Sequence, residues 1–278
     1  MLRTDDEKRK DYLAEKKYSW RNEQMRLAQH VKLCNTEEWQ NDENFEGLRL
    51  VAGVDVSFIK GDDVNAVIGL VVLQFPSLEV VYEDCQLVKL EEPYIPSYLA
   101  FREVPPILDV MGKLYYTKPQ YIPQLIVVDG NGLLHPREFG LACHLGCYLW
   151  TPTIGAAKKL FVMEGIQRDE KHKESIRTLS SAGDKFFLFN KRNKCLGAAL
   201  KPTNDSQIPI YVSPGHCIDI ETACRVITRL AKYRIPEPTR QADLRSRKMI
   251  EKLFPNGFIK GADDEYEFGD DPYQGLLH

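Results

Sequence analysis

Three acidic residues stand where apolar stretches of the chain end or are interrupted. Asp55 interrupts the apolar run over residues 48–58, Asp129 ends the run over residues 125–129, and Glu103 lies between them in sequence. A charge in such surroundings is costly to bury unless it is paired, hydrogen-bonded or bound to a metal ion. Clustered carboxylates repel one another, and hard divalent cations with oxygen ligands relieve that repulsion. The three acids together predict a metal-dependent active site that uses Mg²⁺, although each aspartate taken singly fits a turn or capping residue better.

Three strands are expected to carry the first of these acids. Their predicted ranges are residues 48–59, 65–75 and 78–90, with short Gly/Asp and Pro/Ser turns between them. Short turns between successive strands imply antiparallel pairing. Asp55 then lies on the first strand of the sheet.

The later elements carry the other two acids. A helix is expected from Ser97 to about residue 114, with Ser97 as its N-cap, and the pair Pro105-Pro106 must kink or interrupt it. Glu103 lies on this helix. The remaining predicted elements are a buried strand over 124–129, a helix opened by Pro136 and running to about residue 150, a strand over 153–157, a hairpin of 185–190 and 195–200, a short strand over 210–212, and helices over 219–233 and 239–254.

The order of these elements predicts one mixed α/β sheet with helices on its faces. Residues 46–254 are expected to form that domain, residues 1–45 an N-terminal extension with a long amphipathic helix over 5–34, and residues 255–278 an acidic, disordered tail. Ligands in open α/β sheets gather at strand ends. The three acids can therefore converge although they are distant in sequence.

Composition and charge narrow the class of protein. The chain has 278 residues, 43% of them hydrophobic, which suffices for one large domain. No stretch reaches the roughly 18 consecutive apolar residues of a membrane helix, and the N-terminus has no apolar signal-peptide core. Seven scattered cysteines fit reduced thiols in the cytosol or nucleus. The net charge of −3 combines an acidic tail with a mildly basic body, which permits nucleic-acid binding without requiring it.

Six short motifs, taken in order, resemble the Endonuclease V family, and most closely its vertebrate branch. They cover residues 54–58, 93–96, 98–103, 128–132 with 135–137, 154–158 and 238–243, and the similarity extends over roughly residues 45–250. The resemblance implies a ribonuclease-H-like fold, in which three antiparallel strands are followed by parallel strands and flanked by helices. It also implies a nuclease dependent on Mg²⁺, with Mn²⁺ able to substitute, that recognises inosine and cuts the second phosphodiester on its 3′ side.

The resemblance assigns roles to the acids. Asp55, Glu103 and Asp129 match the family's metal ligands, and Asp243 matches a fourth active-site position where bacterial relatives often carry His. Asp243 can accordingly be a ligand, orient a metal-bound water, or be a surface acid of its helix. Two metal ions about 3.5–4 Å apart would activate water and stabilise the leaving 3′ oxygen, which leaves 3′-hydroxyl and 5′-phosphate ends.

Lys158 matches the family's lysine near the scissile phosphate. An ammonium group fixed there offsets the charge that develops on the pentacovalent phosphorus. Its neighbour Lys159 is an alternative for the role, and taken alone the two lysines fit a solvated surface pair. Lys158 completes the expected catalytic set with the four acids.

The segment Pro93-Tyr94-Ile95-Pro96 is held extended and stiff by its two prolines. An aromatic and an aliphatic side chain at the tip of a rigid loop can replace the stacking that is lost when a base leaves the helix. The segment resembles the family's wedge. Without that resemblance it fits a proline-rich surface turn whose Tyr94 packs locally.

The resemblance implies that Gly130, Gly132 and His135 lie at the pocket for the base or beside it. Glycines let a backbone approach a ligand closely because they lack Cβ. Backbone groups can recognise the carbonyl and ring N–H of hypoxanthine, and a tight fit can exclude the extra amine of guanine. His135 alternatively caps the helix that follows.

The expected substrates are inosine-containing RNA, cut chiefly when single-stranded, and deoxyinosine-containing DNA. One alternative is a DNA repair endonuclease that acts chiefly on deoxyinosine DNA. Another is a non-catalytic reader of inosine RNA, for which three buried acids would be an unneeded cost. The protein is expected to be a monomer of the cytoplasm and the nucleus, including the nucleolus, with no membrane partner.

Overall fold

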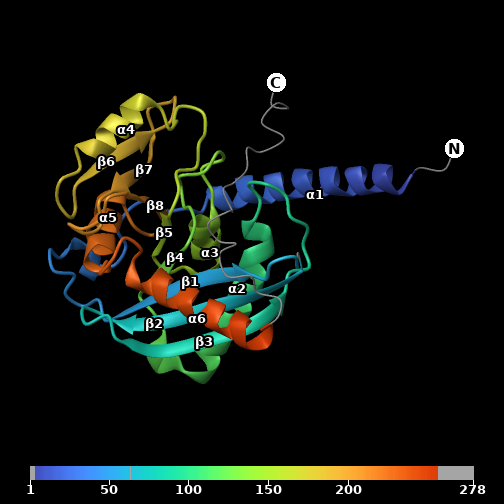
Figure 1. The fold of residues 1–278 in the computed structure, drawn as a ribbon, viewed down its shortest axis with the longest axis horizontal. Coiled ribbons are helices and arrows are strands. Elements are labelled where there is room, and N and C mark those ends of the chain that lie inside the picture. The colour runs from blue at the N-terminus through green and yellow to red at the C-terminus, as the bar shows by residue number, and fades with distance from the viewer. Residues whose placement is uncertain (1–3, 63, 256–278) are drawn as a thin grey trace.

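A computed structural model describes residues 4–62 and 64–255 of the chain, which form one eight-stranded mixed sheet flanked by helices (Figure 1). The strand order is β3-β2-β1-β4-β5-β8-β7-β6. In chain order the elements are α1 (Asp5–Ala28), η1 (Glu38–Asn41), β1 (Leu50–Phe58), β2 (Asn65–Gln74), β3 (Val80–Lys89), α2 (Ala100–Thr117), η2 (Pro119–Tyr121), β4 (Leu125–Val128), α3 (Leu141–Leu149), β5 (Thr153–Ala157), α4 (Glu170–Arg177), β6 (Lys185–Phe189), β7 (Cys195–Leu200), β8 (Ile210–His216), α5 (Ile220–Arg229) and α6 (Glu237–Leu253).

The sheet changes direction at β1. Strands β1, β2 and β3 pair antiparallel in sequence order, whereas β4 pairs parallel with β1 and β5 pairs parallel with β4. Parallel neighbours require a crossover, and α2 and α3 supply the crossovers into β4 and β5. The predicted fold class, three antiparallel strands followed by parallel strands, is confirmed.

Helices cover both faces of the sheet. Helices α5 and α6 pack on one face and α2 and α3 on the other, so the strands between them are buried on both sides. Helix α2 contributes Ile107, Met111 and Leu114, which are fully buried. Because side chains alternate along a strand, Val54 points to the α2 face and its neighbour Asp55 points to the α6 face.

Helix α6 lies directly on β1 because Gly53 has no side chain. A Cβ atom at Gly53 would stand 2.0 Å from the backbone oxygen of Pro238, in the first turn of α6. The close approach carries α6 across β1 and β2, as Figure 1 shows. Asp243 and Ser246 are thereby placed over the part of β1 that holds Asp55.

Helix α2 departs from the sequence-based expectation at its N-cap, and its proline pair does not cause the interruption that was one of two expected outcomes. Its N-cap is Leu99, not Ser97, because Ser97 adopts a left-handed backbone conformation with φ 62°. Pro105 and Pro106 lie inside the helix and do not interrupt it. Each proline removes one helical hydrogen bond. The apolar face of α2, buried against the sheet on both sides of the prolines, keeps the helix continuous.

The helix expected to open at Pro136 begins only at Leu141, with Gly140 as its N-cap. Residues 135–140 instead form a turn in which Glu138 has φ 53°. Long-range hydrogen bonds from Arg137 to Ser97 hold this turn, and no local sequence signal reveals them.

Other boundaries differ by less. Helix α1 ends at Ala28 rather than near residue 34, because the chain then runs alongside β8, where the Lys32 carbonyl accepts a hydrogen bond from the Cys217 N–H. Strand β8 continues past residue 212 to His216, and the short charged helix α4 was not predicted. The proposed acidic tail lies, apart from Pro255, outside the described residues. None of the helices in the described ranges is long and apolar enough to cross a membrane.

Candidate active site

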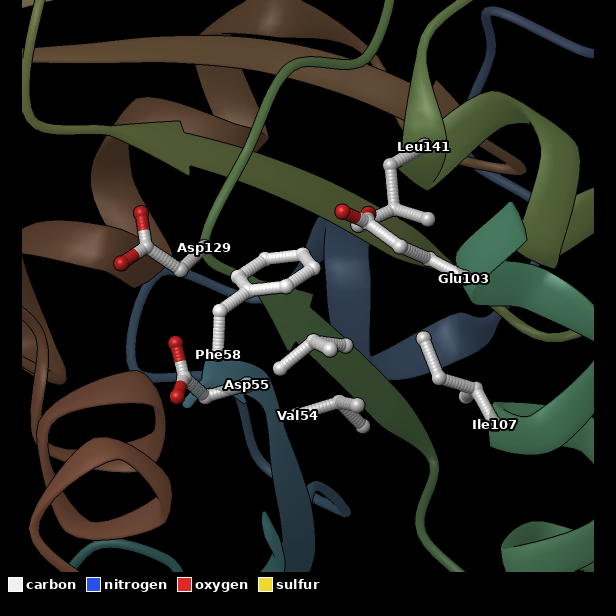
Figure 2. Close-up of a pocket in the computed structure, with 8 residues that line it drawn as sticks. Val54, Asp55, Phe58, Glu103, Ile107, Asp129 and Leu141 are labelled. Atoms are coloured by element: carbon white, nitrogen blue, oxygen red, sulfur yellow. The ribbon is translucent and has the colours of Figure 1, made fainter. Parts of the chain in front are cut away.

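Asp55 and Asp129 are neighbours because of the parallel register between β1 and β4. Val54 is the partner of Val128, the last residue of β4, so the next residue on each chain segment is an aspartate. The backbone N–H of Asp129 donates to the carbonyl of Val54 over 3.3 Å and extends the pairing. Neighbouring strands are about 4.8 Å apart. Figure 2 shows both carboxylates on the same side of the pocket.

Glu103 reaches the same pocket from the opposite face of the sheet. It lies in the first turn of α2, and it lines one pocket with Asp55 and Asp129. In Figure 2 the two aspartate carboxylates stand on one side of the Phe58 ring and the Glu103 carboxylate on the other. Within residues 4–62 and 64–255, no three His, Cys, Asp or Glu side chains are grouped closely enough to hold one metal ion. The structure thus brings the two aspartates together directly and places Glu103 across the pocket from them.

Two of the acids are hard to ionise in this pocket. Burial, followed by repulsion from Asp129 and Asp243, raises the pKa of Asp55 to about 7. Burial, followed by repulsion from Asp55 and Asp129, raises the pKa of Glu103 to about 7. Both carboxyl groups lack a cationic partner strong enough to offset burial. Perturbed acids in a pocket are typical of functional sites.

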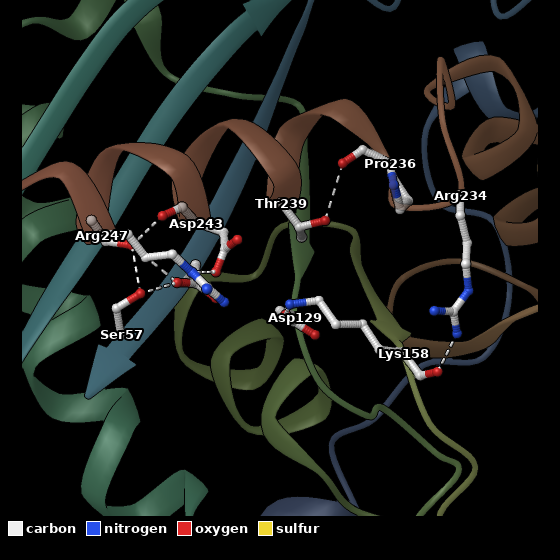
Figure 3. A network of polar contacts seen from close by, with 10 residues as sticks. Ser57, Asp129, Lys158, Arg234, Pro236, Thr239, Asp243 and Arg247 are labelled. Atoms are coloured by element: carbon white, nitrogen blue, oxygen red, sulfur yellow. Dashed lines mark hydrogen bonds and ion pairs between the residues drawn. The ribbon is translucent and has the colours of Figure 1, made fainter. Parts of the chain in front are cut away.

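Two hydroxyl groups hold the Asp55 carboxylate. Ser57 and Ser246 both donate to its Oδ2, over 2.9 and 3.1 Å, and the two hydroxyl oxygens lie 2.7 Å apart. Figure 3 labels Ser57 in this network. Ser57 follows Asp55 by two residues on one strand and therefore shares its face. Neither serine was among the predicted site residues. The alternation would have revealed Ser57, but Ser246 is 191 residues away from Asp55.

Lys158, the residue directly after β5, brings a positively charged side chain into the site. Its Nζ lies 2.7 Å from Oδ2 of Asp129, in the partly exposed pair drawn in Figure 3. Burial opposes the charge of Lys158, but Asp129, Asp243 and Asp55 outweigh it and raise the lysine pKa. Arg234 donates to the backbone carbonyls of Lys158 and Pro209 and fixes the chain after β5.

Asp243 lies near the aspartate pair without bonding to it. Its Oδ1 accepts from Nε of Arg247 over 2.8 Å, one helical turn along α6. Its charge contributes to the raised pKa of Asp55. Asp243 is therefore close enough to influence the site electrostatically, and it is neutralised in part by its own arginine.

The loop over residues 93–96 exposes one aromatic side chain. Tyr94 is 55% exposed, whereas Ile95, expected beside it at the tip, is buried against Trp20 and Tyr98. Pro93 and Pro96 flank the pair, and Pro93 is half-buried whereas Pro96 is exposed. Tyr94 alone thus forms the aromatic tip, and Ile95 anchors the loop.

The backbone around Gly130 and Gly132 packs against protein. A Cβ atom at Gly132 would stand 2.2 Å from the carbonyl oxygen of Pro214. The missing side chain of Gly132 therefore lets β8 pack closely against this loop. The Gly132 N–H donates to Ser213 Oγ over 2.8 Å. The side-chain oxygen of Asn131, between the glycines, is buried and has no donor among the described residues. This loop therefore holds one buried acceptor that has no donor in the described residues.

His135 has a structural hydrogen-bonding pattern. Its Nδ1 accepts from the Arg137 N–H over 3.2 Å, so Nε2 carries the proton and donates to the Ser97 carbonyl over 3.0 Å. Burial, and then the charge of Arg137, lowers its pKa to about 3. His135 is accordingly neutral and joins the pocket loop to the segment after Tyr94.

The acids fit a hard divalent cation in their donor chemistry. Asp55 and Asp129 supply carboxylate oxygens from adjacent strands, and Glu103 supplies a third acid across the same pocket. Burial and mutual repulsion raise the pKa of two of them, which a bound cation would reverse. Mg²⁺ prefers such oxygen ligands.

Acids on adjacent parallel strands, with a lysine beside them and a third acid across the pocket, fit a metal-dependent nuclease, and comparisons with known proteins agree on a nuclease. A family model for Endonuclease V matches residues 26–244. Human Endonuclease V is 48% identical over 233 residues, covering 84% of this chain and 83% of the relative. The chain therefore belongs to the Endonuclease V family and is an endonuclease, a phosphodiester hydrolase.

Solved structures lead to the same family. The catalytic domain of human Endonuclease V superposes with a TM-score of 0.85 at 46% identity, covering 87% of this chain and 98% of that one. Endonuclease V from Ciona intestinalis, in complex with a 23mer DNA containing an inosine followed by a ribo-adenosine, superposes with a TM-score of 0.79 at 34% identity, covering 86% of this chain and 98% of that one.

Proposed function

We propose that this chain is a metal-dependent endonuclease that cleaves the second phosphodiester on the 3′ side of inosine. The proposed substrates are chiefly single-stranded RNA and also deoxyinosine-containing DNA, and the products carry 3′-hydroxyl and 5′-phosphate ends. The observation that carries the proposal is that Asp55 and Asp129 are neighbours on adjacent segments, next to Lys158, in a pocket that Glu103 also lines. The Ciona intestinalis complexes with inosine-containing DNA support inosine as the recognised base.

The acids and the lysine divide the chemistry between them. Mg²⁺, or Mn²⁺ in its place, would be held by Asp55, Asp129 and Glu103, and would supply activation of water and stabilisation of the leaving 3′ oxygen. Ser57 and Ser246 orient the Asp55 carboxylate through their hydrogen bonds. Lys158 keeps Asp129 paired, and its partly exposed ammonium offsets negative charge on an approaching phosphate.

Base recognition is proposed for the loop over residues 130–135 and for Tyr94. The ring N–H of hypoxanthine is a donor at the position where adenine has an acceptor. The unmatched side-chain oxygen of Asn131 offers an acceptor for such a donor. The exposed ring of Tyr94 can take the place of an extruded base in the stack.

A preference for RNA rests on the sugar that follows inosine. The nucleic acid in the Ciona intestinalis complexes has a ribo-adenosine directly after the inosine. A 2′-hydroxyl is the group by which a protein distinguishes RNA from DNA at one site. We propose a monomeric enzyme that acts on such strands in the cytoplasm and in the nucleus, including the nucleolus.

The test compares one inosine strand in three forms: all RNA, all DNA, and DNA with a single ribonucleotide directly 3′ of inosine. With Mg²⁺ in excess, single-turnover rates should rank RNA and the single-ribose strand well above DNA. Equal rates on RNA and DNA would favour a DNA repair endonuclease. Binding of inosine strands without any product would favour a non-catalytic reader.

A further inference from the structure

Three side chains along one face of α1 support the segment that carries Tyr94, two of them by direct contact and the third, Gln24, through Arg137. Lys16, Trp20 and Gln24 are four residues apart, and this spacing puts them in line on a helix. Figure 1 shows that the N-terminal part of α1 extends away from the sheet, so these contacts fix a projecting helix to the loops beside the pocket. The contacts meet the loop at its start, its middle and its end.

Lys16 holds the start of the loop. Its Nζ lies 2.6 Å from Oε2 of Glu92, the residue before Pro93. The same ammonium lies 5.6 Å from the centre of the Trp20 ring. The ion pair and the cation–π contact join the first part of the loop to the next residue on the helix face.

Trp20 holds the middle of the loop. Its ring is 7% exposed and packs with Ile95 and Tyr98, and it stacks on Phe101 with centroids 5.0 Å apart and planes 5° apart. Ile95 is thereby drawn inward. Its neighbour Tyr94 is left on the outside, 55% exposed.

Gln24 holds the end of the loop through Arg137. The Gln24 side chain is 2% exposed, donates to the Phe139 carbonyl over 2.9 Å and accepts from Arg137 Nε over 2.5 Å. The Arg137 guanidinium in turn donates to Oγ and to the carbonyl of Ser97, and it lies 3.8 Å from the centre of the Tyr98 ring.

Ser97 needs this support. Its φ of 62° is a left-handed conformation that a side chain makes costly, and such a backbone persists only where its surroundings determine it. The Ser97 carbonyl receives hydrogen bonds from both Arg137 and His135. Gln24 therefore fixes the pocket loop and the loop of Tyr94 in one arrangement.

We propose that α1 is a positioning element for base recognition, in which Trp20 and Gln24 preset Tyr94 and the 135–139 loop before the nucleic acid binds. This role rests on the proposed function. It goes beyond the family match, because that match begins at residue 26, after all three contacts. A preset wedge is needed most when the target base must be pulled out of a stacked, paired strand.

The test measures Mg²⁺-dependent cleavage of one inosine strand, unpaired and in a duplex, by Trp20→Ala and Gln24→Ala. Trp20→Phe is the conservative variant, and Tyr18→Ala is the matched control because Tyr18 lies on the same helix and is 71% exposed. We expect kcat/KM to fall about tenfold or more on the duplex, mainly through KM, and to change less than about threefold on the unpaired strand. Trp20→Phe should recover most of the loss, and Tyr18→Ala should match the wild type.

Hydrogen exchange over residues 92–98 provides a readout that needs no activity. It should accelerate in Trp20→Ala and Gln24→Ala and stay unchanged in Tyr18→Ala. Equal losses on the two substrates, or unchanged exchange in the loop, would overturn the positioning role while the proposed function stands. If the wild type cuts neither inosine strand, the proposed function itself fails, and the recognition role fails with it.

Discussion

Lys158 Nζ lies 2.7 Å from Asp129 Oδ2, so the lysine forms an ion pair with one of the acids of the site. The ammonium brings a positive charge into a pocket where burial raises the pKa of Asp55 and Glu103. The ion pair also holds the ammonium at the strand ends where a phosphate would approach. One contact thus fixes both a proposed metal ligand and a proposed phosphate contact.

Replacement of Lys158 by Met should slow cleavage much more than it weakens binding. Without the ammonium, charge on the phosphorus is not offset in the transition state, and we expect kcat to fall about 10²–10³-fold with a small change in KM. Lys159→Met is the matched control, because Lys159 is the next residue and is exposed. Equal effects of the two substitutions in steady-state kinetics would contradict the role of Lys158.

Loss of the Ser57 hydroxyl, which donates to Asp55, should raise the Mg²⁺ concentration that the enzyme needs at low pH. The hydrogen bond from Ser57 lowers the pKa of Asp55, so Ser57→Ala should raise that pKa further. Protons compete with metal for a carboxylate. We therefore expect the Mg²⁺ concentration for half-maximal activity to rise about three- to tenfold below pH 7 and to change little at pH 8.5. A shift of the same size at both pH values would count against this explanation.

Metal-free protein should lose stability as the pH rises from about 4 to about 7. Burial raises the pKa of Asp55 from 3.8 to about 7, so in this range the folded state binds a proton that the unfolded state has lost. For Asp55 alone the difference corresponds to at most about 4 kcal/mol. Asp55→Asn should flatten the pH dependence of chemical denaturation. Mg²⁺ should stabilise the wild type more at pH 8 than at pH 5, and no stabilisation at either pH would argue against a metal site.

Asp243 should matter for rate without being indispensable. It is ion-paired with Arg247, and it influences Asp55 through its charge. Residues that act on a metal site without binding the ion typically change its metal affinity or activity 10- to 100-fold. We therefore expect Asp243→Asn to slow cleavage by roughly that factor. Glu251→Gln, an exposed acid on the same helix, is the control. Complete inactivity of Asp243→Asn would indicate a direct ligand, and unchanged activity a surface acid.

The positions of the aspartates could be predicted because their signal is local. A charge inside an apolar strand and another at a strand end are visible in sequence, and the parallel pairing of the two strands follows from the helix between them. The placement of Glu103 on the opposite face could not be predicted in detail, because it depends on how α2 lies on the sheet. The same holds for the Phe58 ring between the acids.

The errors fall where distant segments determine local structure. Pro136 is a good first residue for a helix, yet Arg137 is bonded to Ser97 and to Gln24, which is 113 residues away. Those bonds keep a turn where the local pattern favours a helix. Ser97 fails as an N-cap for the same reason. The hydroxyl of Ser246 reaches Asp55 because Gly53 and Gly69 let α6 lie directly on β1 and β2.

The most direct test is the single-turnover cleavage of two RNA strands that differ only in carrying inosine or adenosine at one position. With Mg²⁺, the wild-type protein should cut the inosine strand at the second phosphodiester on its 3′ side and leave the adenosine strand intact. Asp55→Asn and Asp129→Asn should cut neither strand. Equal cutting of both strands, or undiminished cutting by the two aspartate variants, would contradict the proposed site and its specificity.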